Sequence, residues 1–582
     1  MKKLRYIAVV LSSLFICLGP TAMAQSSAEQ VRLHVNKSHY MPGEIIWFKA
    51  FVSHMQDEPV YPYSPVLYVE MLAPTLESVL QTKVAIGQGL TNSGSFFIPP
   101  NLASGVYTLV AYTDIMKKAG AEGFFAQEIV VLNPYISTLS SESLNSKASN
   151  HRLFIEPTDA EGEARRITLE LPQQNFAKRT QVEVGVEMSP DWSGGKRAGD
   201  AEFSVSVYKL EGLYQETDLA LGRIGTMPGN RIDREPALSN PEVRYHQIAF
   251  QLTKKQREEV WAEQDVFLAI PGPDPMLYTG RTDQNGLVTF YVKNLYGTQQ
   301  LAIGLENGEL SDAKLRTPFF MNYQHYAVDG RVPSIPDLDS EDWKKLLLNQ
   351  SLNVQAENLF FAKERGFTHE MPRNALPFFG ERVVEYLLDD YTRFVLMEEV
   401  IREYVTEIRL QRRAGDYRFR VLNEATGQYF DESPLILLDG TPIDHENDMI
   451  ALDPLKVKKI SIVPNRYYLG NQVYEGVVQF STYEGYLSDF VLGPNMTVFQ
   501  YEGMQNERVF FSPQHVDTDR RLIRMPDTRT ALYWNPAFSV DASGRAQLSF
   551  YTSDVPGDYL IEVQGRSADG TVDRTTARFR VD

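Results

Sequence analysis

The segment Pro434-Leu-Ile-Leu-Leu-Asp439-Gly440-Thr-Pro-Ile443 places an Asp-Gly pair between two apolar runs. Such a pair is typical of a tight hairpin turn, because glycine adopts positive φ without the cost of a Cβ atom. Two further β-rich stretches follow at 452–460 and 474–482. The sequence therefore predicts strand, tight turn and strand here, and it makes Asp439 and Gly440 a candidate interaction turn.

The order and content of residues 430–485 resemble the plug domain of TonB-dependent outer-membrane receptors. The chain after residue 500 lacks the run of long alternating strands that an outer-membrane barrel requires. The resemblance implies a plug-like α+β domain over 413–500. Without a barrel to fill, such a domain is expected to bind a partner rather than to form part of a channel.

Upstream, between 335 and 412, apolar residues recur at spacings of three and four, which predicts a helical segment. The expected helical positions are Val383, Val384, Leu387, Leu388, Phe394, Met397, Val400, Ile401 and Tyr404. The acidic pairs at 389–390 and 398–399 each precede an arginine by four residues. Ion pairs between Asp389 and Arg393 and between Glu398 and Arg402 explain these acids better than a catalytic carboxylate pair does.

The N-terminal region, 25–134, is predicted to be a β-sandwich, because short strands rich in β-branched and aromatic residues alternate with Gly and Pro turns. It resembles a macroglobulin-type domain of the α2-macroglobulin family through Tyr40-x-Pro42-Gly43-Glu44 before the Trp47 strand, Gly94-x-Phe96 and Ser104-Gly105-x-Tyr107. That family's covalent chemistry needs a Cys–Gln thioester. The single cysteine, Cys17, lies in a predicted signal peptide, so a covalent protease trap is excluded.

The remaining chain is also β-rich, which makes the whole protein mainly β. Residues 150–330 are predicted to form further macroglobulin-like or Ig-like sandwiches interrupted by a long loop at 211–245, and residues 501–582 a C-terminal Ig-like β unit. With the segment 388–405, these pieces resemble large exported proteins of Bacteroidetes-type bacteria. Those proteins join a macroglobulin-like N-terminus to a plug-like C-terminus.

The first 24 residues have the pattern of a cleaved signal peptide: a basic start, an apolar run from Ile7 to Leu18, and Ala22-Met-Ala24 before Gln25. The net charge of −18 argues against nucleic acid and against simple adsorption to anionic lipid. The sequence thus indicates an exported, multidomain protein of the periplasm or cell surface.

Neither a catalytic nor a metal or cofactor site is predicted, because histidines and acids do not fall in ligand spacings. His34, His39 and His54 are expected to be ordinary exposed or hydrogen-bonded side chains. The acids of 444–448 suit a polar loop, and those of 337–342 suit a helix N-terminus. For the aromatic pairs at 360–361, 467–468 and 510–511, a binding surface and burial between domains remain equal alternatives.

We therefore expect a non-enzymatic envelope scaffold or accessory subunit that binds a protein at the outer membrane, either a single protein or a transporter complex. Two alternatives remain. One is a substrate-capture module for a TonB-dependent transporter, which needs an aromatic groove between sandwiches. The other is a non-covalent protease inhibitor, for which the loop 211–245 is the candidate bait.

The mature protein is expected to begin at Gln25 and to carry no lipid, because Ile16 precedes Cys17 where a lipoprotein site needs a small residue. Intact mass of envelope-derived protein checks this expectation. A retained Cys17 bearing acyl chains would contradict it.

Overall fold

The computed structural model confirms a mainly β protein, with 50% of the described residues in strands and 12% in helices. It describes residues 29–54, 64–87, 90–119, 123–136, 166–193, 201–210, 224–226, 245–253, 260–305, 310, 312–316, 320, 341–366, 368–369, 377–487, 490–515, 524–567 and 570–582. Within these ranges, no helix is both long enough and apolar enough to cross a bilayer. The predicted signal peptide lies outside the described residues.

The first sandwich follows the sequence-based expectation closely. One sheet has the order β1-β3-β6 and the other the order β13-β8-β7-β4-β5, with β2 beside β8 and the helix α1 after β7. The bounds are β1 Glu29–Val35, β2 His39–Tyr40, β3 Ile45–His54, β4 Val66–Leu72, β5 Ser78–Ala85, β6 Ser93–Phe97, β7 Gly105–Thr113, α1 Asp114–Ala119, β8 Phe125–Val131 and β13 Ile224–Thr226.

The second sandwich is assembled from two distant parts of the chain. Its sheets have the orders β10-β34-β33-β12-β31 and β32-β11-β9. The bounds are β9 Ile167–Glu170, β10 Asn175–Phe176, β11 Gln181–Met188, η2 Pro190–Ser193, β12 Glu202–Lys209, β31 Ala531–Phe538, β32 Arg545–Tyr551, β33 Gly557–Arg566 and β34 Val572–Val581. The predicted division places these C-terminal strands in a separate unit, whereas here they share one core with 167–209.

The third sandwich is likewise completed by a late strand. Its sheets have the orders β17-β14-β19 and β16-β15-β18-β30. The bounds are β14 His246–Thr253, β15 Asp265–Ile270, β16 Met276–Arg281, β17 Leu287–Val292, β18 Thr298–Leu305, β19 Asp312–Arg316 and β30 Met496–Glu502. One apolar cluster runs from the first sandwich into the third, so these two bodies are packed together.

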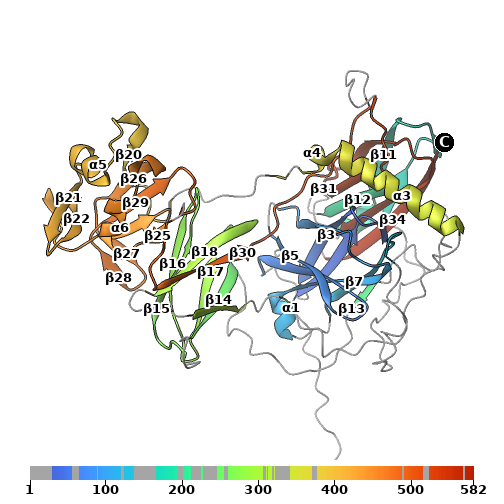
Figure 1. Ribbon diagram of the computed structural model, residues 1–582. Helices are drawn as coiled ribbons and strands as arrows, with labels where there is room; N and C mark the ends of the chain where they lie inside the picture. The colour runs from blue at the N-terminus through green and yellow to red at the C-terminus, as the bar shows by residue number, and fades with distance from the viewer. Residues whose placement is uncertain are drawn as a thin grey trace, which may run out of the picture.

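An α/β domain, here called the insert domain, lies between β19 and β30 in the chain and at the far end of the molecule in Figure 1. Its main sheet has the order β20-β26-β29-β24-β25, and β21-β22-β23 forms a second sheet. The bounds are β20 Val384–Leu387, η4 Leu388–Asp390, α5 Met397–Tyr404, β21 Ile408–Arg413, β22 Asp416–Asn423, β23 Gln428–Tyr429, β24 Leu435–Leu438, β25 Thr441–Pro442, α6 Glu446–Ala451, η5 Pro454–Lys456, β26 Val457–Val463, β27 Tyr467–Leu469, β28 Gln472–Tyr474 and β29 Val477–Thr482.

The prediction of a helix over 383–388 is wrong. Residues 384–387 instead form β20, which pairs antiparallel with β26, and only 397–404 of the later positions are helical. A run of so few apolar residues fits both periods, and pairing with β26 decides in favour of the strand. Upstream, the long helix α3 (Glu341–Phe360) and the short α4 (Ala362–Arg365) lie along the outside of the first two sandwiches (Figure 1).

Candidate functional site

The turn at Asp439 and Gly440 has the expected local geometry. Both residues have positive φ, +48° and +86°, and Leu438 pairs with Thr441 across a two-residue hairpin. The Asp439 carboxylate is buried and accepts hydrogen bonds from the Thr482 backbone N–H and hydroxyl, each at 2.7 Å, and from the Leu487 N–H at 3.0 Å. This aspartate therefore fixes the end of β29 against β24.

The same turn contacts the third sandwich rather than solvent. A Cβ atom on Gly440 would lie 2.3 Å from the Cβ of Pro275, which belongs to the β15–β16 turn. A Cβ on Gly470 would similarly lie 2.4 Å from the Thr279 hydroxyl. The turn is thus an intrachain contact that seats the insert domain, and a partner of this domain would need other residues.

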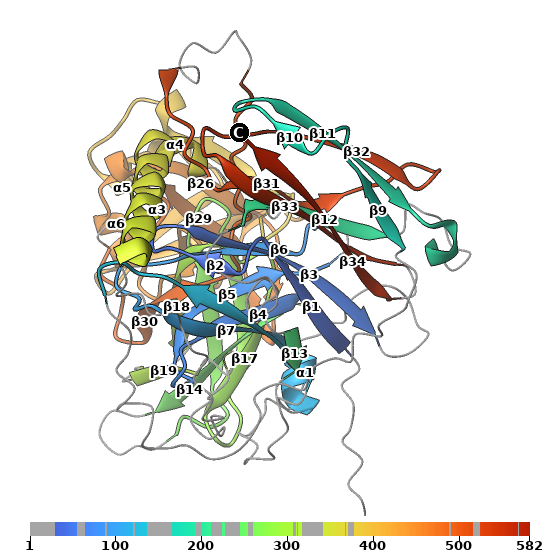
Figure 2. The ribbon, with the colours of Figure 1, turned by 90° about the vertical axis from the view of Figure 1, so that its right-hand side faces the viewer.

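A polar cluster joins the first and second sandwiches, whose sheets face each other in Figure 2. His34 of β1 is fully buried and lies 2.6 Å from the Ser204 hydroxyl and 3.3 Å from the Ser206 hydroxyl of β12. Its Nε2 also lies 3.7 Å from Glu562, which accepts a 2.7 Å bond from Arg574. Of the three histidines expected to be ordinary side chains, His34 is therefore an interdomain contact.

The electrostatics of this cluster keep the imidazole neutral. Burial lowers the pKa of His34 to about 4, with Glu562 opposing the shift and Arg574 adding to it. Burial would raise the pKa of Glu562, but Arg574 outweighs that effect and holds it below the ordinary value. Beside them, the Glu202 carboxylate forms ion pairs with the Lys49 ammonium at 3.3 Å and with the Arg566 guanidinium at 2.9 Å.

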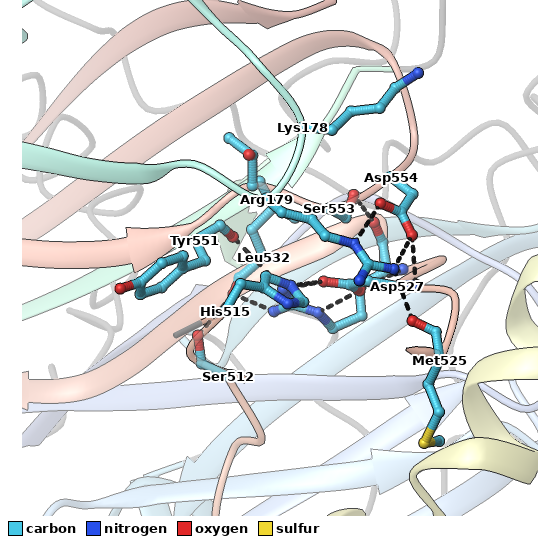
Figure 3. Close-up of polar contacts among 12 residues, drawn as sticks. Lys178, Arg179, Ser512, His515, Met525, Asp527, Leu532, Tyr551, Ser553 and Asp554 are labelled. Atoms are coloured by element: carbon cyan, nitrogen blue, oxygen red, sulfur yellow. Dashed lines mark hydrogen bonds and ion pairs between the residues drawn. The ribbon is translucent and has the colours of Figure 1, made fainter. Parts of the chain in front are cut away.

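A second charged cluster ties the C-terminal strands to the loop before β11 (Figure 3). Arg529 donates to both oxygens of the buried Asp527 at 2.8 and 2.7 Å, and Arg179 does the same to Asp554 at 2.7 and 2.6 Å. The Asp527 backbone N–H donates to Asp554 at 2.8 Å. Burial would raise the pKa of Asp527, yet Arg529 and the bond from His515 hold it well below its usual range.

This cluster contains a His–Asp pair but not a nucleophile relay. His515 Nε2 lies 2.9 Å from Asp527, while its Nδ1 is buried and has no partner among the described residues. The Ser553 hydroxyl donates to the Arg529 carbonyl, and the Ser512 hydroxyl to the Leu532 carbonyl. These side chains hold backbone segments together, and no spacing signal in the sequence could have revealed them.

The other candidate residues fall into ordinary contacts. Arg402 pairs with Glu398 at 2.9 Å on α5, and Arg393 pairs with Asp389 of the short 3-10 helix η4 at 3.7 Å, outside any α-helix. Glu446 accepts from Arg418 at 2.8 Å. Among the residues that the structure describes, no three acids, histidines or cysteines cluster as a metal site would require. Residues 337–340, and the loop 211–245 except β13 and Tyr245, lie outside the described ranges.

The aromatic pairs divide between the two alternatives. Phe361 is buried and packs against Phe511 with ring centres 5.0 Å apart, and Phe510 packs edge-on against Trp47 at 5.4 Å. These rings lie inside the chain's own domain junctions. Tyr468, by contrast, is 69% exposed on the β27–β28 hairpin.

A set of exposed apolar side chains that the sequence analysis did not identify lies on the insert domain, around η4, just before α5 and on the segments that Arg393 contacts. We call it the insert band; its exposed members are Leu387, Tyr391, Val395, Leu396, Leu455 and Tyr483. Arg393 joins their segments, because it donates to the carbonyls of Pro454 and Val457, each at 3.0 Å, and lies over the Tyr483 ring. A group of exposed apolar side chains of this kind is typical of an interaction surface.

Comparison with known proteins adds little. No family model and no curated protein match the chain. Among solved structures, Escherichia coli α2-macroglobulin activated by porcine elastase is 10% identical with a TM-score of 0.23, covering 95% of this chain and 44% of that one. Salmonella α2-macroglobulin reacted with methylamine is also 10% identical with a TM-score of 0.23, and the match covers 95% of this chain and 39% of that one. The chain thus spans less than half of each macroglobulin, and TM-scores this low support no inference.

Replacing Gly440 by Val is expected to destabilise the protein. Strain at positive φ costs about 1–3 kcal/mol and overpacking against Pro275 costs about as much again. Chemical denaturation measures the loss. Gly427→Val is the matched control, because Gly427 also has positive φ, +67°, but a Cβ there meets no atom within 4 Å. Equal losses in both variants would contradict the Pro275 contact.

Stability is expected to fall between pH 7 and pH 5 because of His34. A group whose pKa is lowered on folding binds more protons when unfolded, so stability is lost as pH falls from about 6.5 toward 4. The His34 contribution lowers the free energy of unfolding by about 2 kcal/mol at pH 5 relative to pH 7. Urea unfolding of His34→Gln should show a smaller change, with the exposed His445→Gln as control. The pKa of His39 is also lowered to about 4, so this histidine contributes to the pH dependence of stability in the His34→Gln variant as well. An unchanged pH slope in His34→Gln would refute this assignment.

Proposed function

We propose that this protein is a non-enzymatic, exported scaffold of a Gram-negative cell envelope that binds a protein partner at the outer membrane through the insert band. The exposed apolar residues of that band carry the proposal. Val395 and Leu396 are 74% and 56% exposed, and they directly precede α5, whose inner residues are buried in the domain core. The sequence from 388 to 405 therefore supplies a core on one side and an exposed surface on the other.

The seating of the insert domain supports a binding role. The chain enters it after α4 and leaves it into β30, which pairs with β18 over seven residues, from Gly304 to Thr298. The contacts of Gly440 with Pro275 and of Gly470 with Thr279 add two further points of attachment. A surface held on a rigid body loses less entropy on binding than a flexible one.

The proposed scaffold has no catalytic activity of its own. In the clusters around His34 and Asp527, arginines, backbone groups and hydroxyls act as structural partners of the buried polar side chains. Export rests on the signal-like residues 1–24, and the outer-membrane partner rests on the plug-like sequence of 430–485.

Val395→Glu is expected to weaken partner binding at least tenfold, because it places a charge at the centre of an apolar contact. A partner is first identified by mass after affinity purification from solubilised outer membranes, and its binding is then measured with both purified proteins. Tyr291→Ser, an exposed aromatic on β17, is the control. Full-strength binding by Val395→Glu at an unchanged melting temperature would reject the insert band as the binding surface.

A further inference from the structure

The helix α3 carries apolar side chains on two separate faces, about a third of a turn apart. Its inner face buries Leu347 and Val354 against Met41, Val130 and Leu132 of the first sandwich. Its outer face exposes Leu348, Leu352 and Leu359, whose side chains are 46%, 60% and 75% exposed. A surface helix normally has one apolar face and one polar face. The second apolar face therefore needs its own explanation.

The outer residues follow the spacing of a helix-pairing seam. Positions 348, 352, 355 and 359 are separated by four, three and four residues, so they lie along one line of the helix. Gln355 is the polar member of that line. The ring of Tyr135, 67% exposed, lies beside it, because the Tyr135 hydroxyl accepts a bond from Gln355 at 3.4 Å. We call Leu348, Leu352, Gln355, Leu359 and Tyr135 the α3 stripe.

The helix cannot turn to hide this stripe. The side-chain amide of Asn358 donates to the Gly43 carbonyl at 3.0 Å, and the Thr528 hydroxyl donates to the Asn353 carbonyl at 2.9 Å. These bonds tie α3 to the first sandwich and to the chain just before β31 of the second. A Cβ on Gly43 would lie 3.2 Å from Val354, so the helix also sits close to the turn beneath it. The stripe is thus held facing outward.

The charges near the ends of the stripe indicate the chemistry of its partner. Lys345 lies three residues before Leu348 on the same line, and Lys363 lies just beyond the end of α3, in α4; both are exposed. Glu341, at the first turn, is the acid on this line. In a chain of net charge −18, exposed lysines at both ends of an apolar stripe favour a partner of opposite sign.

We propose that the α3 stripe docks an amphipathic helix of a protein partner, with apolar residues at alternating three- and four-residue spacing and acidic residues on the flanks. The apolar side chains of that helix lie between Leu348, Leu352 and Leu359, and its acids face Lys345 and Lys363. This surface belongs to the body opposite the insert domain, so it adds a second contact to the proposed scaffold and rests on that function only in being a protein contact.

The test uses two designed helical peptides with the same leucines at seam positions, one with glutamates and one with lysines on the flanks. Binding to the full chain is measured by fluorescence anisotropy. The acidic peptide is expected to bind at least tenfold more tightly than the basic one. Leu352→Gln with Leu359→Gln should reduce its affinity at least tenfold, because a few central apolar residues carry most of such contacts. Lys345→Glu with Lys363→Glu should remove the preference for the acidic peptide.

Because all four substituted side chains are exposed, the variants should melt at the wild-type temperature. Equal affinity for both peptides, or affinity unaffected by the leucine variant, would overturn the proposal. Light scattering of the free chain and binding to phosphatidylglycerol vesicles test the other occupants. Dimerisation or vesicle binding that the leucine variant abolishes would overturn it in favour of a second copy or a lipid surface. Val395→Glu should leave peptide binding intact, so failure of the insert band and failure of the α3 stripe are distinguishable.

Discussion

The arrangement of the domains depends on the pairing of β12 with β33 and β31. The strand β12 has a neighbour on each side in its sheet, and both neighbours come from more than three hundred residues further along the chain. Phe203, Val205 and Val207 point into the sandwich core, while Ser204 and Ser206 face His34 of the first sandwich. One strand therefore closes the second sandwich and carries its contact with the first. Everything between β12 and β31 must leave this sandwich and return to it.

That return constrains the insert domain and α3. The chain leaves the third sandwich, runs along the first two sandwiches as α3 and α4, enters the insert domain and returns to the third sandwich through β30. Gln505 and Glu507 then bond to the first sandwich near Ser93 and Ser95. A surface on the insert domain is thus held at a defined place relative to α3. A protein built in this way can present two contact surfaces at once, and the rigid spacing between them selects which partners can be held together.

Local sequence signals predicted the turn at Asp439 and Gly440, the strands of the first sandwich, and the helix that carries Glu398 and Arg402. Those signals failed at Val384–Leu387, where a helical spacing of apolar residues became a strand beside β26. They also missed the Asp527 cluster, because Arg179 and Asp554 are 375 residues apart and neither lies in a recognisable motif. Burial of charge in pairs is a property of the assembled sheets.

The sequence by itself determined the strands of the first sandwich, where the tight turns fall and that charge is mostly acidic, because backbone preferences and side-chain alternation act over a few residues. Only the tertiary structure decided which strands share a sheet, that Pro275 covers Gly440, and that the outer face of α3 is left exposed. Those outcomes depend on which distant surfaces exclude water from each other, and no local pattern in the chain encodes that choice.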